Sequence, residues 1–242
     1  MRTTLRYNRV VLKLSGEALS GEEHPFDHER LLGLAQAIHQ AVQEGIQLGI
    51  VLGAGNIFRA RSANLEVVER VTADHVGMLG TLMNAAILRD YLRAEGLKAR
   101  IFSPREHVPL SRPFARDQAL PLLQSGHVLI LAGGTGNPYF TTDSAAALRA
   151  LELGADALLK GTQVDGVYDK DPHRYPDARR FPRLTYEEAI ARRLRVMDLT
   201  AITLCAEGNL PVVVFDISHP DNLLRLLRGG ELGTRIAKES SS

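Results

Sequence analysis

The stretch HVLILAGGTGNPYFTTDSAAALRALELG, residues 127–154, joins an apolar run to a helical pattern through a loop rich in glycine and threonine. The run 127–132 is typical of a buried strand, and 144–154 is typical of a helix. Free N–H groups in such a loop, together with the N-terminus of the next helix, attract phosphate. A strand-to-helix turn also needs glycine for its geometry alone, and Asp143 could serve only as an N-cap. The stretch therefore predicts a strand–loop–helix unit with a candidate phosphate site.

Five more apolar runs resemble the first one, and helical patterns alternate with them. The runs lie at 9–14, 46–53, 98–103, 155–161 and 210–217, and the helical patterns at 28–45, 75–96, 144–154, 196–208 and 220–230. The runs lack strict alternation of apolar and polar residues, as expected for strands covered on both faces. This order predicts an α/β fold, a three-layer α/β/α sandwich around a central, mostly parallel sheet. The polar, proline-rich segment 165–183 is expected to form a long functional loop.

The length and composition allow one large domain or two coupled lobes, and we expect a single domain over residues 1–242. Of the residues, 45% are hydrophobic, and 29 basic and 28 acidic side chains leave a formal net charge of +1. This balance favours neither nucleic acid nor an anionic membrane as a partner. Cys205 is the single cysteine, which fits a reducing compartment. With no apolar run of 18 residues or more, we expect a cytoplasmic protein.

Several common phosphate and metal motifs are absent. The sequence has no G-x-x-x-x-G-K-[ST] and no H-E-x-x-H, and Tyr139 stands where a dinucleotide fingerprint would need its third glycine. The aspartates of 165–171 lack the glycine and closing glutamate of a calcium-binding EF-hand loop. We therefore predict no dedicated metal site.

Three glycine-rich or hydroxyl-rich turns instead follow three of the expected strands. They are KLSG (13–16), GAGNIFR (53–59) and the loop at 133–142. The carboxyl ends of parallel strands meet at one edge of the sheet, so the turns should converge on one crevice. Lys13 and Lys160 end two of the strands, although only five of the 29 basic residues are lysine. The crevice suits two phosphorylated ligands, since phosphoryl transfer needs alignment and positive charge.

Five motifs together resemble the bacterial uridylate kinases, or UMP kinases, of the amino acid kinase superfamily. They are KLSGEAL, GAGNIFR, DHVGMLGTLMNA, AGGTGNPYFTTDSAA and VDGVYDKDP, and the resemblance extends over residues 9–236. GTGNPYFTTDSAA is specific to the uridylate kinases, whereas KLSG and VDGVY indicate only the superfamily. The resemblance implies transfer of the ATP γ-phosphoryl group to UMP, giving UDP and ADP, in pyrimidine nucleotide biosynthesis. It also implies Mg²⁺ carried with ATP.

The resemblance also assigns residues to each nucleotide. The ATP side would include Lys13, Leu14, Ser15, Gly16, Gly55, Arg59, Thr162, Tyr168 and Asp171. The UMP side would include Ala54, Asp74, Thr135, Gly136, Asn137, Pro138, Tyr139, Phe140, Thr141 and Thr142. The catalytic residues would be Lys13, Asp143 and Lys160. The N-terminal part would mainly serve UMP and oligomer contacts, and the part from residue 155 onward would mainly serve ATP.

These assignments agree with the chemistry of the side chains. Lys13 can meet the transferred phosphoryl group, and Asp74 can accept hydrogen bonds from ribose hydroxyls. Asp143 is interpreted as an organiser of nearby cationic and amide groups. Lys160 could instead form only a salt bridge, and Arg59 only a surface ion pair.

Two departures from the family pattern stand out. Ala54 stands where many members have glycine. A backbone contact from this residue to the nucleotide survives the change unless the residue needs a positive φ. The segment SGEEHPFDHER, residues 20–30, differs from the glycine-rich version associated with activation by GTP in some relatives.

The resemblance further implies a homohexamer and inhibition by UTP, with the apolar face of the expected helix at 75–94 as a candidate dimer contact. Another phosphotransferase of the superfamily, or a non-catalytic nucleotide- or anion-binding protein on the same fold, remains an alternative.

Overall fold

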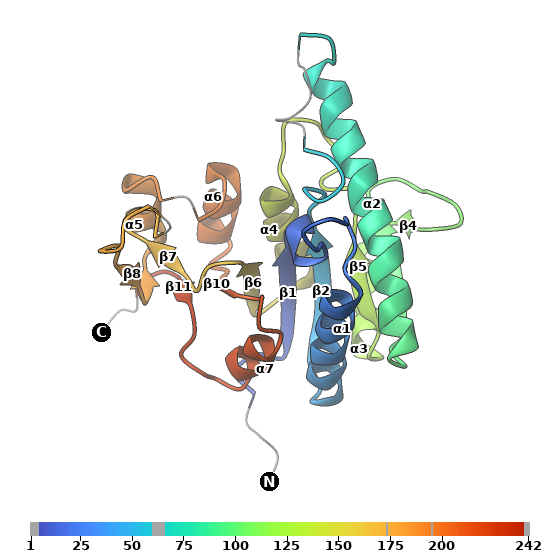
Figure 1. Cartoon of the computed structure of the whole chain (residues 1–242). Helices are drawn as coiled ribbons and strands as arrows, with labels where there is room; N and C mark the ends of the chain where they lie inside the picture. Colours follow the sequence, from blue (N-terminus) through green and yellow to red (C-terminus); the bar gives the residue numbers. More distant parts are fainter. Residues whose placement is uncertain (1–4, 60–65, 173, 195, 240–242) are drawn as a thin grey trace.

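A nine-stranded sheet forms the centre of the computed structural model, which describes residues 5–59, 66–172, 174–194 and 196–239 (Figure 1). Its strand order is β4-β3-β5-β2-β1-β6-β10-β11-β9, and β10–β11 is the antiparallel pair among parallel ones. The strands are β1 (Arg9–Leu14), β2 (Gln47–Leu52), β3 (Ala99–Ser103), β4 (Arg112–Pro113), β5 (Val128–Leu131), β6 (Ala157–Thr162), β9 (Arg183–Leu184), β10 (Val212–Asp216) and β11 (Thr234–Ile236). The mostly parallel sheet predicted from the sequence is confirmed.

Helices cover both faces of the sheet, as the sandwich prediction requires (Figure 1). One face packs against α1 (His28–Gln43), α2 (Arg70–Ala94) and α7 (Asp221–Leu227). The other packs against α3 (Arg116–Gln124), α4 (Thr142–Leu153), α5 (Tyr186–Ala191) and α6 (Leu199–Glu207). Each face has its own buried apolar cluster, which explains why the strands are apolar on both sides.

The alternation of side chains along β1 and β6 decides where the lysines lie. Val10, Leu12 and Leu14 face the layer of α1, whereas Val11 faces the layer of α4. Side chains two residues apart in a strand share a face, so Lys13 lies on the side of Val11. By the same rule Lys160 shares the face of Leu158. Both lysines therefore point toward the layer that contains α4.

The structure corrects several boundaries expected from the sequence. The helix expected at 75–96 begins at Arg70 and ends at Ala94. The segment 165–183 is more than a loop, because β7 (Val167–Tyr168) and β8 (Arg180–Phe181) pair within it. Helices α3 and α5 and the short strands β4, β9 and β11 were not expected.

The prediction of one domain over 1–242 includes residues 1–4 and 240–242, which lie outside the described part. Within that described part, every helix falls short of the length or apolar content needed to cross a lipid bilayer.

Candidate active site

Lys13 and Lys160 lie side by side at the centre of the sheet. They are direct partners in the parallel register of β1 and β6. Asp143 lies between their ammonium groups, with its Oδ1 3.0 Å from Nζ of Lys13 and its Oδ2 2.7 Å from Nζ of Lys160. All three side chains are at most 13% exposed. The structure therefore brings together the three residues that the sequence assigned to catalysis.

Burial and charge act against each other in this cluster. Burial by itself raises the pKa of Asp143, but the attraction of Lys13 and Lys160 outweighs it and holds that pKa below its ordinary value. Burial lowers the pKa of Lys160, and Asp143 offsets only part of that effect. One carboxylate facing two ammonium groups leaves one positive charge in a confined place. Such a charge can stabilise a transferring phosphoryl group.

The N-terminus of α4 supplies further positive potential beside the lysines. Thr141 is its N-cap, and its hydroxyl oxygen accepts from the backbone N–H groups of Asp143 and Ser144 at 3.0 and 3.3 Å. Asp143 itself lies in the first turn, so the interpretation of this residue as the N-cap is wrong. Its side chain is instead free to hold the lysines, as the organiser interpretation predicted.

Asp198 ties the end of the loop and α4 to the layer of α6. Its carboxylate accepts from the hydroxyls of Thr141 and Ser144 and, as the N-cap of α6, from the N–H of Ala201. Sequence reasoning missed this residue. Its position immediately before the apolar run 199–206 is an N-cap signal that would have found it.

The first two glycine-rich turns pack directly against each other. A Cβ placed on Gly16 would lie 2.7 Å from the backbone nitrogens of Gly55 and Asn56, and one on Gly55 would lie 2.6 Å from Oε1 of Glu17. Only glycine allows this approach of two backbones. The turns at 13–16 and 53–59 thus form one wall of the crevice, in agreement with the prediction that they converge.

The residues flanking Gly16 contribute mainly backbone to this wall. The side chain of Leu14 is buried in the core, and its carbonyl accepts from the N–H of Gly53 at 2.8 Å. Ser15 precedes the 3₁₀ turn Gly16–Ala18 without capping it through its side chain.

Ala54 fits its position without a left-handed backbone. It is absent from the residues with positive φ in the described part of the chain. Its methyl group faces Gly80 of α2, where an added Cβ would lie only 2.9 Å from the Cβ of Ala54. The condition under which the change from glycine would disturb a backbone contact, a positive φ, is therefore not met at residue 54.

Arg59 turns toward Glu17 rather than toward the lysines. Its guanidinium forms an ion pair with that carboxylate and donates to the Gly55 carbonyl at 3.0 Å. The side chain is 58% exposed. The ion pair expected as an alternative is therefore present, at the rim of the first two turns.

Asp74 on α2 anchors the third glycine-rich loop. Its Oδ2 accepts from the N–H of Tyr139 at 2.8 Å, and both carboxylate oxygens accept from Nε of Arg70 at 2.9 Å. Tyr139 has φ of 70°, which is uncommon for a residue with a side chain. Its ring, largely exposed, lies under the guanidinium of Arg70 at 5.4 Å. Asp74 thus stabilises a strained backbone at the point expected to hold UMP.

The remaining residues expected to bind UMP lie along the same loop. Thr135 and Asn137 bond to each other within it, through the Thr135 hydroxyl and the Asn137 backbone. Gly136 has φ of 80° and packs on Pro104, and Phe140 is half exposed. Thr142 opens α4. Thr81 fixes the start of the loop, because its hydroxyl accepts from the N–H of Gly133 at 2.7 Å. This residue was not identified from the sequence.

A cavity extends from Lys160 toward the C-terminal part of the chain. It measures about 790 Å³, and its lining includes Thr162, Tyr168 and Asp171. These are the residues expected to bind ATP that lie outside the turns at 13–16 and 53–59. The Tyr168 hydroxyl donates to Asp165, and this bond, with burial and the charge of Asp165, raises the pKa of Tyr168. A volume of this size suits a nucleotide.

The carboxylate at the centre of this site is paired with protein cations. Asp143 holds two lysines, and the described residues contain no group of three or more His, Cys, Asp or Glu side chains suited to a metal ion. Magnesium carried by ATP remains a prediction.

The match to known proteins agrees with this arrangement of strand ends, turns and lysines. A family model described as the amino acid kinase family matches residues 8–216, and the chain belongs to that family.

Its relatives place it, within that family, among the uridylate kinases. The uridylate kinase of Porphyromonas gingivalis is 46% identical over 236 residues, covering 97% of this chain and 99% of the relative. That of Legionella pneumophila is 48% identical over 233 residues, covering 96% and 94%. The solved structure of the UMP kinase from Bacillus anthracis matches with a TM-score of 0.93 at 35% identity, over 97% of each chain.

Proposed function

We propose that this chain transfers the γ-phosphoryl group of ATP to UMP, giving UDP and ADP. The observation that carries the proposal is the cluster of Lys13, Asp143 and Lys160 at the meeting point of the nucleotide-binding elements. Phosphoryl transfer needs little covalent chemistry from the protein, and positioning with charge stabilisation supplies most of the catalysis. The relatives named as uridylate kinases support UMP as the acceptor.

The two nucleotides would approach the lysines from opposite sides. ATP would occupy the cavity lined by Thr162, Tyr168 and Asp171, which reaches Lys160. UMP would lie along Asp74 and the loop 135–142, which ends at the N-terminus of α4. Asp143 would keep the two ammonium groups together, so that their charge meets the phosphoryl group in line between the nucleotides.

Mg²⁺ would arrive with ATP as part of the substrate. Because Asp143 already binds two lysines, the protein would add few ligands of its own. Calorimetry should show weak Mg²⁺ binding to the protein alone and tighter binding with nucleotide present. Tight binding without nucleotide would contradict this account.

The direct test is a coupled assay of ADP release with UMP, CMP, dUMP, TMP and AMP as acceptors. We expect activity with UMP, weak activity with dUMP and little with CMP. Activity only with a carboxylate, carbamate or isoprenoid phosphate would favour another phosphotransferase of the superfamily. No ADP release with any acceptor would favour a binding protein.

Assembly into a homohexamer is also proposed, with α2 in the dimer contact. Its outer side exposes a row of apolar side chains that the described part of the chain leaves uncovered: Val71, Val76, Leu79, Met83 and Ile87. An apolar patch of this kind is typical of a protein interface. Light scattering that gives a monomer mass would refute this proposal.

Inhibition by UTP would follow from competition at the UMP site, since UTP shares the uridine and carries more phosphate. Saturating UMP should then reverse the inhibition. Inhibition that persists at saturating UMP would place UTP elsewhere. The cytoplasm is the proposed location, since nucleotide substrates are found there and Cys205 has no cysteine partner in the chain.

A further inference from the structure

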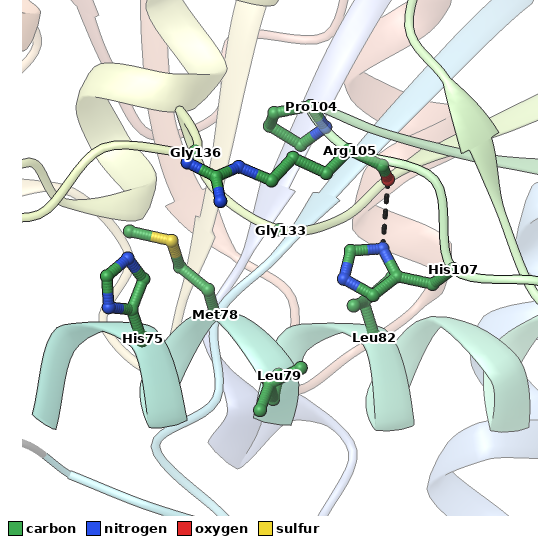
Figure 2. Close-up of a pocket in the computed structure, with 9 residues that line it drawn as sticks. All are labelled: His75, Met78, Leu79, Leu82, Pro104, Arg105, His107, Gly133 and Gly136. Carbon is green, nitrogen blue, oxygen red and sulfur yellow. Dashed lines mark hydrogen bonds between the residues drawn. The ribbon is translucent and has the colours of Figure 1, made fainter. Parts of the chain in front are cut away.

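Two further cavities differ in the charge of the residues that line them. The one drawn in Figure 2 lies between α2 and the loop after β5, and its lining is mostly apolar apart from one arginine and two histidines. The other lies toward the opposite end of the sheet, beside β10, β11 and β9, and measures about 160 Å³. Its lining includes four arginines: Arg6, Arg180, Arg183 and Arg235. This positive charge is concentrated in one hollow of a chain whose formal net charge is only +1.

The sheet places two of these arginines directly beside each other. Arg235 of β11 is the register partner of Arg183 of β9 and, on its other side, of Val213 of β10. Val213 is buried on the side of α7, whereas Leu184 and Ile236 are buried on the side of α6, so both arginines point to the side of α7. Like charges at neighbouring positions on one face of a sheet repel each other and destabilise it. Stability alone therefore does not explain this pair.

Carboxylates neutralise little of this charge. Glu231 is the one acid among the described residues of the lining, and its Oε1 lies 3.9 Å from Nη2 of Arg183. Their side chains are 90% and 77% exposed, and a pair this exposed contributes little in water. Arg235 is half-buried, and its guanidinium forms no hydrogen bond or ion pair within the described part of the chain. Its N–H donors are therefore available to a ligand.

Arg180 borders the same cavity in a fixed position. Its Nη1 donates to the carbonyls of Gly233 and Asp165, at 2.9 and 3.2 Å. Gly233 has φ of 76°, and an added Cβ would collide with the backbone of β10, so this turn requires glycine. The turn before β11 thus holds one guanidinium at the rim, while Arg183 and Arg235 reach the cavity from the sheet.

We propose that this cavity binds a phosphate-type oxyanion, either a free one or the terminal phosphates of a nucleotide. A planar guanidinium donates two parallel hydrogen bonds to such an anion, which makes arginine well suited to phosphate. A cavity of about 160 Å³ has room for one or two phosphate groups, whereas a whole nucleotide needs roughly 300 Å³ or more. Val213, Leu226 and Leu232 add apolar surface to the lining, and charges attract each other more strongly where water is partly excluded.

The bound anion would remove the repulsion between Arg183 and Arg235 without taking part in phosphoryl transfer. The two arginines point to the side of α7, whereas Lys13 and Lys160 point toward the layer of α4, on the opposite face of the sheet. The proposal is therefore independent of the proposed function, and its test does not require catalytic activity.

The experiment titrates inorganic pyrophosphate into the protein by calorimetry, in a buffer without phosphate or Mg²⁺. Arg235→Gln and Arg183→Gln should each weaken binding at this cavity about tenfold or more relative to wild type, because charge-assisted hydrogen bonds are lost. Arg112→Gln is the matched control, since this exposed arginine lies on the strand at the other edge of the sheet and has Phe102 as its register partner. Lys13→Ala should lose only pyrophosphate that binds at the candidate active site.

The same titration with UTP distinguishes the two sources of the anion. Binding that depends on Arg235 and is seen with pyrophosphate identifies a free anion, and binding that depends on Arg235 and is seen only with UTP identifies the phosphates of a nucleotide. Thermal unfolding gives a second reading. Without any anion, Arg183→Gln should unfold at the same temperature as wild type or a higher one, because a repulsion is removed. Pyrophosphate should then raise the unfolding temperature less in this variant than in wild type.

Four results would overturn the proposal. Binding of pyrophosphate and UTP that is unchanged in both arginine variants would place the anions elsewhere. Loss of binding in Lys13→Ala alone would assign it to the candidate active site. Clear destabilisation of anion-free Arg183→Gln would show that this arginine stabilises the fold directly. Self-association that is lost in the arginine variants, with no anion binding in wild type, would assign the arginines to a contact between copies of the chain.

Discussion

Lys13 and Lys160 are register partners on adjacent parallel strands, and a single carboxylate, that of Asp143, binds both. Two neighbouring ammonium groups repel each other, so this arrangement depends on Asp143 and leaves an unbalanced positive charge for the substrates. The pairing of β1 with β6 therefore sets the positions of both lysines before any substrate binds.

Substitution of Lys13 should impair chemistry rather than UMP binding. Lys13→Ala and Lys13→Arg should each lower kcat by roughly 10²-fold or more, the order seen when one preorganised charge at the transition state is lost. A planar guanidinium is larger than the ammonium group that Asp143 binds here, so it would not keep the same geometry beside Asp143 and the neighbouring Lys160. Single-turnover phosphoryl transfer, with UMP affinity measured separately, tests this. Lys238→Arg, an exposed position, is the matched control. Near-normal kcat in Lys13→Arg would show that any positive charge suffices.

Asp143→Asn should change the pH dependence of the reaction. Asp143 raises the pKa of Lys160 against the opposing effects of burial and Lys13. Without the carboxylate, Lys160 should lose its proton at lower pH, so the alkaline fall in kcat should move to lower pH. The pH profile of kcat measures this, with the exposed Asp117→Asn as control. If the alkaline fall in kcat stays at the same pH in Asp143→Asn, the charge of Lys160 does not contribute to the reaction.

The same variant should also reveal how Asp143 contributes to stability. Its pKa is lowered in the folded protein, so its contribution is present above the unfolded pKa of about 4 and is lost as pH falls through the folded pKa. On the acid side, the difference in free energy of unfolding between wild type and Asp143→Asn should therefore shrink only below pH ~4. Urea denaturation at several pH values tests this, and a difference that shrinks near pH 6 would contradict it.

Asp198→Ala should weaken both the fold and UMP binding. It removes the N-cap of α6 and the acceptor for the hydroxyls of Thr141 and Ser144. Loss of an N-cap costs about 1 kcal/mol, and the unpaired hydroxyls add to that. Urea denaturation and the KM for UMP provide the two readings. Glu207→Gln, at the exposed opposite end of α6, should change neither.

Asp74→Ala should raise the KM for UMP more than the KM for ATP. The variant frees the N–H of Tyr139, whose left-handed backbone then has no partner to stabilise it. Steady-state kinetics with each nucleotide varied in turn measures both constants. Asp90→Ala, an exposed position on the same helix, is the control. Equal increases in the two constants would refute the assignment of Asp74 to UMP.

The thiol of Cys205 should be inert in the native protein. Burial, with smaller contributions from the charges of Asp143 and Asp198, raises its pKa to about 12. A thiol in this state has almost no thiolate at neutral pH and little access to reagents. Ellman's reagent should detect one thiol only after denaturation. Rapid reaction in the native state would show that the layer of α6 opens readily.

The sequence predicted the parts of the fold that depend on apolar periodicity and glycine. Strands β1, β2, β3, β5, β6 and β10 follow their apolar runs to within one or two residues. The start of α2 was placed too late, because Arg70, Val71 and Thr72 show no clear apolar period. Helix α5 was missed, although Thr185 and Glu188 form a capping box that the sequence contains.

The site itself was predictable only in part. The two lysines were predicted from their positions at strand ends, and they and Asp143 were assigned to catalysis by the resemblance. That Lys13 and Lys160 lie directly opposite each other could be seen only in the structure, in the pairing of β1 with β6. The N-cap role of Asp198 has a local signal, but its bond to Thr141 and the bond of Thr81 to Gly133 join residues more than 50 positions apart, and no local pattern contains them.

The bonds made by Asp198 also limit how such kinases can be recombined. This carboxylate lies in the C-terminal part of the chain, yet it fixes hydroxyls at the start of α4 in the N-terminal part. A chimera that exchanges the part from residue 155 onward between family members would have to keep a hydrogen-bond acceptor at the same place. The two parts of the chain are therefore not interchangeable modules, and protein engineering of either part has to include residue 198.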